Sequence, residues 1–286
     1  MKTFYSFLLE KQNAGDIQDF GFAPVSSWDA EKNYLIPSEF FPKNIFPEAE
    51  TAIVIAVPVL LPILETTPSI FYNEHYHAVN AQLDAQALKI SLFLNNAGFP
   101  TVPIPRDGYA GIPALQKNPT AAFSHKHAAY HAGLGTFGQN NVLLTKDFGP
   151  RIRFTTILTK ATLKDLENMG IPSNILDRAA QMKKENLCIQ CMDCARYCPK
   201  NAIIADKNRP YPLSIIDKQK CVSQSAALAE KGISPCGICI KVCPIGKDRV
   251  HFDRENITYE KDAADENEQN KKRVQAWEHV QKCGFK

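Results

Sequence analysis

The placement of its cysteines constrains this chain more than any other feature. Eight of the nine cysteines in the 286-residue sequence fall in two runs near the C-terminal end. The first run has the spacing C-x2-C-x2-C-x3-C followed by proline, and the second has a lone cysteine before C-x2-C-x3-C and proline. The first run comprises Cys188, Cys191, Cys194 and Cys198, and the second comprises Cys221, Cys236, Cys239 and Cys243.

This spacing is typical of [4Fe-4S] sites. Three thiolates on one tightly turned loop can hold three corners of a cubane, and in two-cluster modules the fourth cysteine binds the other cluster. The sequence therefore predicts two clusters that exchange ligands between the runs. The first cluster site is assigned Cys188, Cys191, Cys194 and Cys243, and the second is assigned Cys198, Cys221, Cys236 and Cys239.

Zinc sites and disulfides are two alternative interpretations of clustered cysteines. Zinc sites usually pair C-x2-C units without the trailing C-x3-C-P, and disulfide frameworks belong to small secreted domains. The long spacer between Cys221 and Cys236 indicates an insertion at the second site, and Cys283 is interpreted as a free thiol. We expect a chain that transfers electrons.

Size and charge narrow the class of protein. The chain is long enough for one sizeable core and a small module. The longest apolar stretch, residues 52–64, is too short to span a membrane, and no targeting segment is visible, so we expect a cytoplasmic protein. A net charge of +3 does not argue for nucleic acid as a partner.

Positive charge is concentrated in residues 101–160. This stretch contains seven cationic residues against Asp107 and Asp147. It is interpreted either as a solvated basic face or as a pocket for an anionic cofactor or substrate. The cationic residues are Arg106, Lys117, Lys126, Lys146, Arg151, Arg153 and Lys160.

The apolar pattern predicts a mixed first domain. β-Branched runs predict strands, apolar residues at helical spacing predict helices, and their alternation favours an α/β or α+β fold. Residues 28–48 are expected to wrap irregularly around the core, and residues 141–145 and 152–159 to form paired strands. The other expected elements are helices at 1–11, 72–96 and 125–132, and strands at 19–24, 51–59 and 101–104.

Four parts follow along the chain. We expect a first domain at 1–165, a linking helix within 166–182, a double-cluster module at 183–250 and a charged tail at 251–286. The tail is expected to form an exposed helix or to stay partly disordered.

A glycine-rich segment lies between the predicted helix at 125–132 and the strands after it. Gly133, Gly135, Gly138 and Gly149 allow close approach of backbone to a large flat ligand. The Gly-Leu-Gly-x-x-Gly pattern does not follow a strand, so it is a weak match to a dinucleotide site.

Together with the cysteine runs, this segment resembles the family of epoxyqueuosine reductases and reductive dehalogenases. The resemblance rests on Ala-Gly-Leu-Gly (132–135), Gly-x-Asn (138–140), Leu-Leu-Thr (143–145) and Gly-Pro-Arg-x-Arg (149–153). It continues in the same order to both cysteine runs and covers roughly residues 10–250.

The resemblance implies a nitroreductase-like α/β domain that holds cobalamin, beside a bacterial-ferredoxin-like module that supplies electrons. The cobalamin would sit base-off, and the chain has no Asp-x-His-x-x-Gly motif for ligating cobalt through histidine. The implied partners are a low-potential donor of the ferredoxin or flavodoxin type and a small or nucleoside-like substrate.

Candidate site residues follow from the same resemblance. Arg151 and Arg153 are interpreted as anion contacts or as structural pairs, and His127 and His131 as core or surface histidines. Tyr72, Tyr76 and His125 are candidate proton donors, although the two tyrosines also suit helix packing. The candidate corrinoid contacts are Ser124, Lys126, Gly133, Leu134, Gly135 and Gly138, with Arg151 and Arg153.

The chain departs from the family pattern in three ways. Epoxyqueuosine reductases carry a catalytic aspartate thirteen residues before Ala-Gly-Leu-Gly, where this chain has Pro119. We also find no helical-repeat extension for tRNA and no twin-arginine leader. Two alternatives therefore stay open, namely an electron-transfer protein that reduces the corrinoid of a partner, and a ferredoxin module fused to a flavin-type fold.

Overall fold

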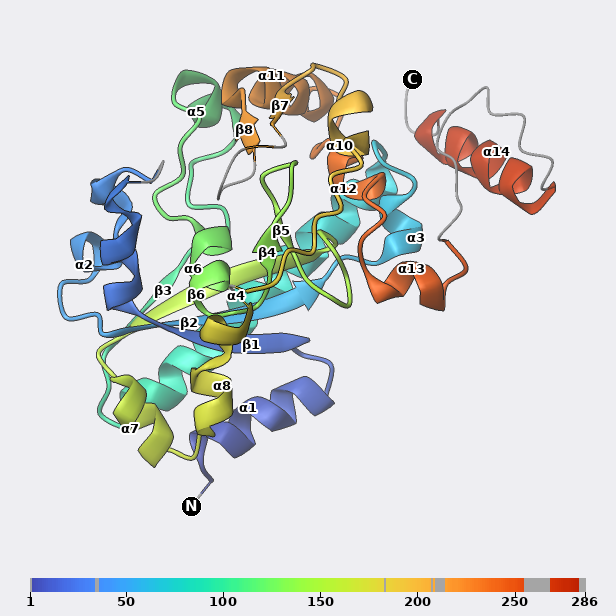
Figure 1. Ribbon diagram of the computed structural model, residues 1–286. Helices are drawn as coiled ribbons and strands as arrows, with labels where there is room; N and C mark the ends of the chain where they lie inside the picture. The colour runs from blue at the N-terminus through green and yellow to red at the C-terminus, as the bar shows by residue number, and fades with distance from the viewer. Residues whose placement is uncertain are drawn as a thin grey trace.

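The computed structural model describes residues 2–33, 36–182, 184–206, 208, 214–254 and 268–282 (Figure 1). Up to residue 182 the elements are α1 (Phe4–Asn13), β1 (Asp19–Pro24), η1 (Val25–Asn33), η2 (Ser38–Phe40), α2 (Pro42–Ile45), β2 (Thr51–Pro58), α3 (Leu61–Leu64), α4 (Ile70–Asn96), β3 (Thr101–Ile104), α5 (Ile112–Lys117), α6 (His125–His131), β4 (Thr136–Phe137), β5 (Leu143–Leu144), β6 (Ile152–Thr159), α7 (Leu163–Asn168), α8 (Ser173–Leu176) and α9 (Arg178–Met182).

The first part of the chain is built on a four-stranded antiparallel sheet in the order β1-β2-β6-β3. β2 pairs with β6 along its whole length, from Thr51 opposite Thr159 to Pro58 opposite Ile152. Most of its side chains are buried on both faces, as the continuous apolar sequence predicts. The mixed α/β class expected from the sequence is confirmed.

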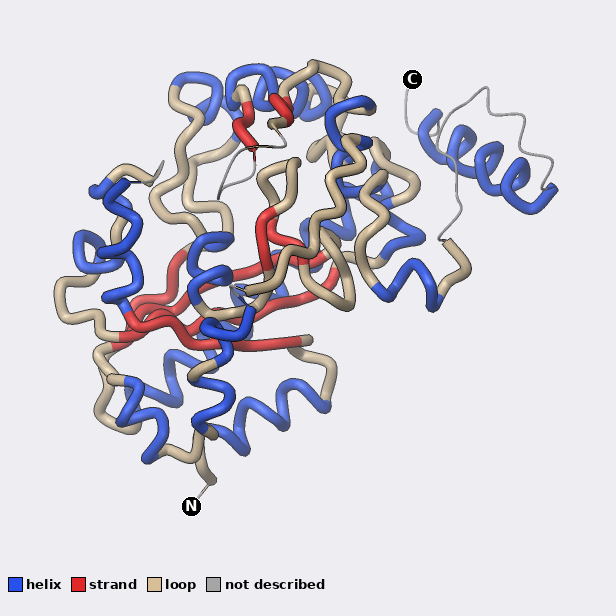
Figure 2. Tube along the Cα trace, viewed as in Figure 1, coloured by secondary structure: helices blue, strands red, loops and turns tan. Residues whose placement is uncertain are grey.

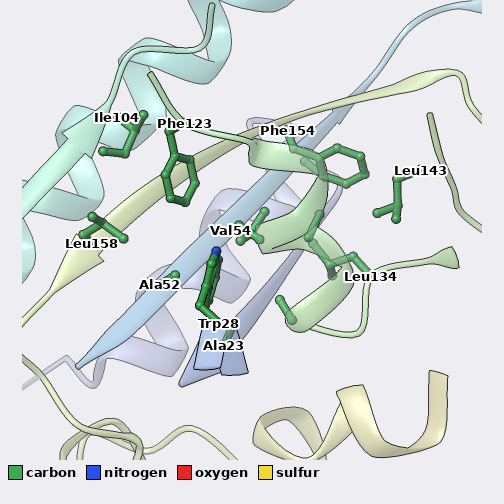
Figure 3. Packing of buried hydrophobic residues seen from close by; sticks show 14 of the residues in the cluster. Ala23, Trp28, Ala52, Val54, Ile104, Phe123, Leu134, Leu143, Phe154 and Leu158 are labelled. Atoms are coloured by element: carbon green, nitrogen blue, oxygen red, sulfur yellow. The ribbon is translucent and has the colours of Figure 1, made fainter. Parts of the chain in front are cut away.

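Helices cover both faces of this sheet (Figures 1 and 2). On one face Ile53 and Ile55 of β2 pack with α1, α4 and α7. On the other face Ala52 and Val54 pack with α6 and with Trp28 of η1, as Figure 3 shows. Alternate residues of β2 therefore pack into two hydrophobic cores, one on each face of the sheet. The sheet is the middle of three layers.

The predicted pairing of residues 141–145 with 152–159 is wrong. β5 instead pairs back onto β4, with Thr136 opposite Leu144 and Phe137 opposite Leu143. β2 already occupies one edge of β6 along its whole length, and β3 occupies residues 156–159 of the other edge. The β4–β5 ribbon therefore projects from the sheet and carries residues 138–142 toward the cysteine runs.

The linker also differs from the single helix expected at 168–180. α7 ends at Asn168, and the chain then forms the short helices α8 and α9. Gly170 adopts φ +96°, and Pro172 precedes α8 with an extended backbone, so no continuous helix can cross this segment.

The remaining elements are α10 (Asp193–Arg196), β7 (Ile203–Ala205), β8 (Ser214–Ile216), α11 (Lys218–Ala229), α12 (Ile238–Lys241), α13 (Lys247–His251) and α14 (Glu268–Lys282). α11 packs on α5, and α14 approaches α4, where the Gln281 side chain donates hydrogen bonds to the carbonyls of Thr66 and Thr67. Cys283 lies outside the described residues. Among the described helices, none has the length and apolar character needed to cross a membrane.

Gly135 enters the β4–β5 ribbon where a side chain cannot fit. A Cβ there would overlap the carbonyl of Leu144, which is backbone and cannot move aside alone. We expect Gly135→Ala to lower the free energy of unfolding by about 3 kcal/mol, at the upper end of overpacking costs. Gly15→Ala should lower the free energy of unfolding by about 1 kcal/mol only, because the positive φ of residue 15 is strained for alanine but nothing lies within 4 Å of the added Cβ. Equal losses in urea unfolding would contradict this account.

Candidate functional site

Two loops of matching geometry carry seven of the eight clustered cysteines, and the eighth, Cys221, lies on α11. Met192, directly after Cys191, and Gly237, directly after Cys236, both adopt a left-handed backbone, at φ 68° and φ 66°. A single helical turn then follows, α10 in the first loop and α12 in the second. This sharp reversal allows thiols three residues apart to converge on one centre.

Cys188, Cys191, Cys194 and Cys243 line one cavity, which agrees with the set that the spacing predicts for the first site. At the second site burial raises the pKa values of Cys221 and Cys236, and Cys198 raises both further. The pKa of Cys239 is raised by burial, by Cys236, Cys221 and Cys198, and also by Cys194 of the first run. The assignment of the fourth ligands stays a prediction. Within the ranges described, no three His, Cys, Asp or Glu side chains converge on the position of a single metal ion.

Burial makes these thiols unfavourable as free anions. It raises the pKa of Cys194 to about 12 and that of Cys243 to about 11, and nearby thiols raise the first further. The pKa of Cys239 lies well above its usual value of 9.0 for the same reason. Thiolates at such positions require bound metal, whose positive charge displaces the protons.

The first part of the chain reaches both cluster sites. Residues 138–140 line the cavity of the first site, and the Asn140 side chain donates a 3.2 Å hydrogen bond to the carbonyl of Cys239 at the second. Thr67 donates a 2.7 Å hydrogen bond to the carbonyl of Cys236. The Tyr72 ring packs against Gly237, where a Cβ would lie 2.8 Å from it.

Two cavities lie beside the second cluster site and meet at Lys126. The larger, of about 430 Å³, is lined by Ser124, Lys126, His127, Asn141 and Lys218, with apolar residues around them. The smaller, of about 230 Å³, is lined by Tyr72, Arg106, His125, Lys126, Arg153 and Ile240. Lys218 and Ile240 each lie one to three residues from a second-site cysteine, so both cavities adjoin that site.

Lys126 holds a buried positive charge between the cavities. Its ammonium donates 2.9 Å hydrogen bonds to the main-chain and side-chain oxygens of Asn141. Burial lowers its pKa to about 8, Lys218 lowers it further, and Cys221 opposes the shift. Lys126, a predicted corrinoid contact, therefore loses its charge near pH 8.

Tyr76 and Arg153 form a polar cluster with a residue that the sequence did not single out. The Tyr76 hydroxyl donates a 3.1 Å hydrogen bond to Asp107, which also pairs with Arg153 at 3.2 Å. The Arg153 guanidinium lies 4.1 Å from the centre of the Tyr76 ring and donates a 2.7 Å hydrogen bond to Asn80. Asp107 was visible as one of two acidic residues in the basic stretch.

Tyr72 is buried deeper, at 2 % exposure, between this polar cluster and the second site. Burial raises its pKa well above the usual value of 10.0, and Cys236 and Cys239 raise it further. The Tyr72 hydroxyl is therefore protonated at neutral pH and can act as a proton donor.

His125 is held neutral with both nitrogens engaged. Its Nε2 lies 3.1 Å from the carbonyl of Pro105, which can only accept, so Nε2 carries the proton. Its Nδ1 accepts from the hydroxyl of Thr156 at 2.9 Å. Burial lowers the pKa of His125 to about 4. The ring thus has no spare proton for a substrate.

The other predicted cofactor contacts occupy different surroundings. A Cβ at Gly133 would meet the backbone of Arg178 and Ala179, and Leu134 is buried in the core. Gly138 lines the cavity of the first cluster site, while Ser124 contacts His127 at 2.5 Å. Gly133 and Gly135 therefore allow close packing of protein against protein.

The neutral state of His125 predicts an acid-sensitive step in stability. The unfolded chain binds a proton near pH 6.5 but the folded chain does not until about pH 4, so stability falls as the pH falls through this window. We expect His125→Gln to reduce this loss by about 1–3 kcal/mol in urea unfolding at pH 4.5 relative to pH 7. The same pH slope in wild type and variant would refute it.

The predicted exchange of ligands between the two runs determines which cysteine variants should lose the same cluster. Cys243→Ala should remove the same cluster as Cys194→Ala, and Cys198→Ala should remove the same cluster as Cys239→Ala, because the fourth ligand of each site comes from the other run. Electron paramagnetic resonance of the reduced variants should give two matching pairs of spectra. Matching of Cys198→Ala with Cys194→Ala would show that each run binds its own cluster.

Comparison with known proteins agrees with this geometry. Residues 187–247 match the family model of the 4Fe-4S dicluster domain. The two [4Fe-4S] clusters expected from the spacing are thereby confirmed.

Relatives by sequence extend the similarity beyond these residues. A tetrachloroethene reductive dehalogenase of Desulfitobacterium hafniense is 25 % identical over 198 residues, which cover 64 % of this chain and 31 % of the relative. An epoxyqueuosine reductase of Synechocystis is 27 % identical over 149 residues, covering 46 % of this chain and 44 % of the relative. The chain thus spans about a third of the first relative's length and less than half of the second's.

Solved structures share the fold at lower identity. Epoxyqueuosine reductase from Streptococcus thermophilus aligns with a TM-score of 0.52 at 18 % identity, over 83 % of this chain and 65 % of that one. A reductive dehalogenase studied for B12-dependent dehalogenation aligns with a TM-score of 0.55 at 19 % identity, over 92 % and 34 %. The resemblance expected from the sequence is confirmed: the chain is a relative of the reductive dehalogenases and epoxyqueuosine reductases, with a 4Fe-4S dicluster domain near its C-terminal end.

Proposed function

We propose that this protein is a corrinoid-dependent reductase of a small or nucleoside-like substrate. The observation that carries the proposal is the pair of cavities that meet at Lys126 directly beside the second cluster site. An electron that reaches the second cluster is therefore close to any ligand bound in these cavities. The names of the relatives, two classes of reductase, support the same reaction type.

The residues around the cavities suit a corrinoid. Apolar side chains such as Phe123, Val142 and Phe154 offer surfaces for a broad ring, and Lys126 and Lys218 offer positive charge to a phosphate. When bound, the corrinoid supplies a strongly reducing cobalt centre. The protein's share is to hold it beside the cluster and to exclude water. A nitroreductase-like assignment of the first domain is part of this proposal, supported by its helix-covered antiparallel sheet.

Electrons enter at the first cluster site in this proposal. At the first site Cys191 is exposed, and neighbouring Ile189 is 66 % exposed. At the second site Cys221 is exposed on α11, whereas Cys236 and Cys239 are half-buried. A ferredoxin or flavodoxin type of donor can therefore approach the first cluster closely. The second cluster passes the electron inward to the cavities.

Tyr72 is the best-placed proton donor. It lines the smaller cavity, and its raised pKa holds the proton at Oη. Tyr76 already donates to Asp107, and His125 is neutral with both nitrogens engaged. Arg153, stacked on Tyr76 and also lining the cavity, offers positive charge to an anionic group.

The proposal predicts stoichiometric corrinoid binding by the anaerobic protein. Supplied with cobalamin and iron, the pure protein should contain about one cobalt beside two cubanes and show a base-off corrinoid spectrum. Lys126→Met should weaken binding of cobalamin about tenfold or more, because it removes the charge shared by both cavities. Flavin in place of cobalt would instead favour the flavin-type alternative.

A second prediction separates catalysis from electron transfer to a partner. Tyr72→Phe should bind corrinoid normally but lower substrate turnover about a hundredfold, the usual scale for loss of a general acid. Wild type that binds no corrinoid, yet reactivates an oxidised corrinoid protein when reduced, would support the electron-transfer alternative.

A further inference from the structure

Arg151 is buried in a position that joins the two parts of the chain. It directly precedes β6, and its side chain is 0 % exposed. It belongs to the Gly-Pro-Arg-x-Arg segment, for which the sequence left open either an anion contact or a structural pair. A guanidinium this deeply buried requires partners for nearly all of its N–H groups.

Those partners all lie in residues 243–248, from the last cysteine of the second run onward. Nη1 of Arg151 donates a 3.0 Å hydrogen bond to the carbonyl of Cys243, and Nη2 donates to that of Ile245. Nε and Nη2 also bind both carboxylate oxygens of Asp248, at 2.6 and 2.7 Å. This bidentate geometry fixes position as well as charge.

The backbone around Arg151 is fitted to the same segment. Gly149 adopts φ +52°, and a Cβ there would overlap the carbonyl of Ile245, so the two chains touch backbone to backbone. From the other side, Arg249 donates a 2.8 Å hydrogen bond from Nε to the same Cys243 carbonyl. The carbonyl of Cys243 thus accepts hydrogen bonds from two guanidinium groups.

Cys243 is the ligand that most needs such support. The other three thiols of the first site share the loop 188–194, whereas Cys243 arrives from the far run and has no such loop to hold it. We propose that Arg151 is a positioning residue for Cys243, so that the first [4Fe-4S] cluster is a site completed by the first part of the chain. This inference concerns the clusters alone and is independent of whether a corrinoid binds.

The test compares two arginine variants in the full-length protein. Arg151→Met should lower iron from about eight to about four per chain after anaerobic reconstitution, by loss of one cubane. Arg178→Met is the matched control, because Arg178 also forms a bidentate pair across the chain, with Asp19 at 2.7 and 2.8 Å, but touches no cysteine. It should keep about eight irons.

Combination with ligand variants identifies the cluster that is lost. Arg151→Met added to Cys194→Ala should remove no further iron, whereas added to Cys239→Ala it should leave almost none. The reduced Arg151→Met variant should also match the Cys194→Ala variant in its paramagnetic resonance spectrum. Full iron in Arg151→Met, or selective loss of the second cluster, would overturn the proposal.

Conservative variants keep the test decisive if Arg151→Met does not fold. Arg151→Lys preserves charge but cannot form the fork, and Asp248→Asn weakens the fork while leaving the donors to Cys243 in place. In these variants the reduction potential of the first cluster should shift, or its iron be lost faster to a chelator, while the second cluster stays as in wild type. Equal behaviour of both clusters in both variants would show that Arg151 acts only on global stability.

Discussion

The convergence of the two cysteine runs is the constraint on which the rest of the structure depends. Because Cys243 of the second run lines the same cavity as Cys188, Cys191 and Cys194 of the first, the two loops must face each other across a short distance. Each loop then presents backbone carbonyls outward. Thr67, Asn140 and Arg151 of the first part bind these carbonyls, so the sheet and the clusters form one connected framework.

Much of the fold was predictable because it depends on local pattern. The apolar run at 51–58 is a central strand, and the helical spacing from Tyr72 onward is a long helix, as expected. The strand at 143–144 was assigned to the wrong neighbour, since pairing depends on which edges of the sheet are still free. The linking helix expected within 166–182 is wrong because Gly170 and Pro172 interrupt it.

The candidate site was also predictable in part, where it depends on local spacing along the chain. Ligand cysteines are predictable because a cubane imposes a spacing along the chain, and the crossed sets follow from it. Asp107 and Asn140 were missed because their partners lie 31 and 99 residues away in sequence. At Gly133 and Gly135 the space that a side chain would need is filled by the protein's own backbone, so close packing alone accounts for both glycines. Their contact with a cofactor stays a prediction.

α11 carries both Cys221 and Lys218, a thiol of the second cluster and a wall of the larger cavity three residues apart. A change in the shape of this wall therefore moves an iron ligand as well. The rest of the lining includes Ile36, Pro37, Phe40 and residues 119–121, none of which is a cysteine. Substitutions at these residues can therefore reshape the cavity without displacing a thiol.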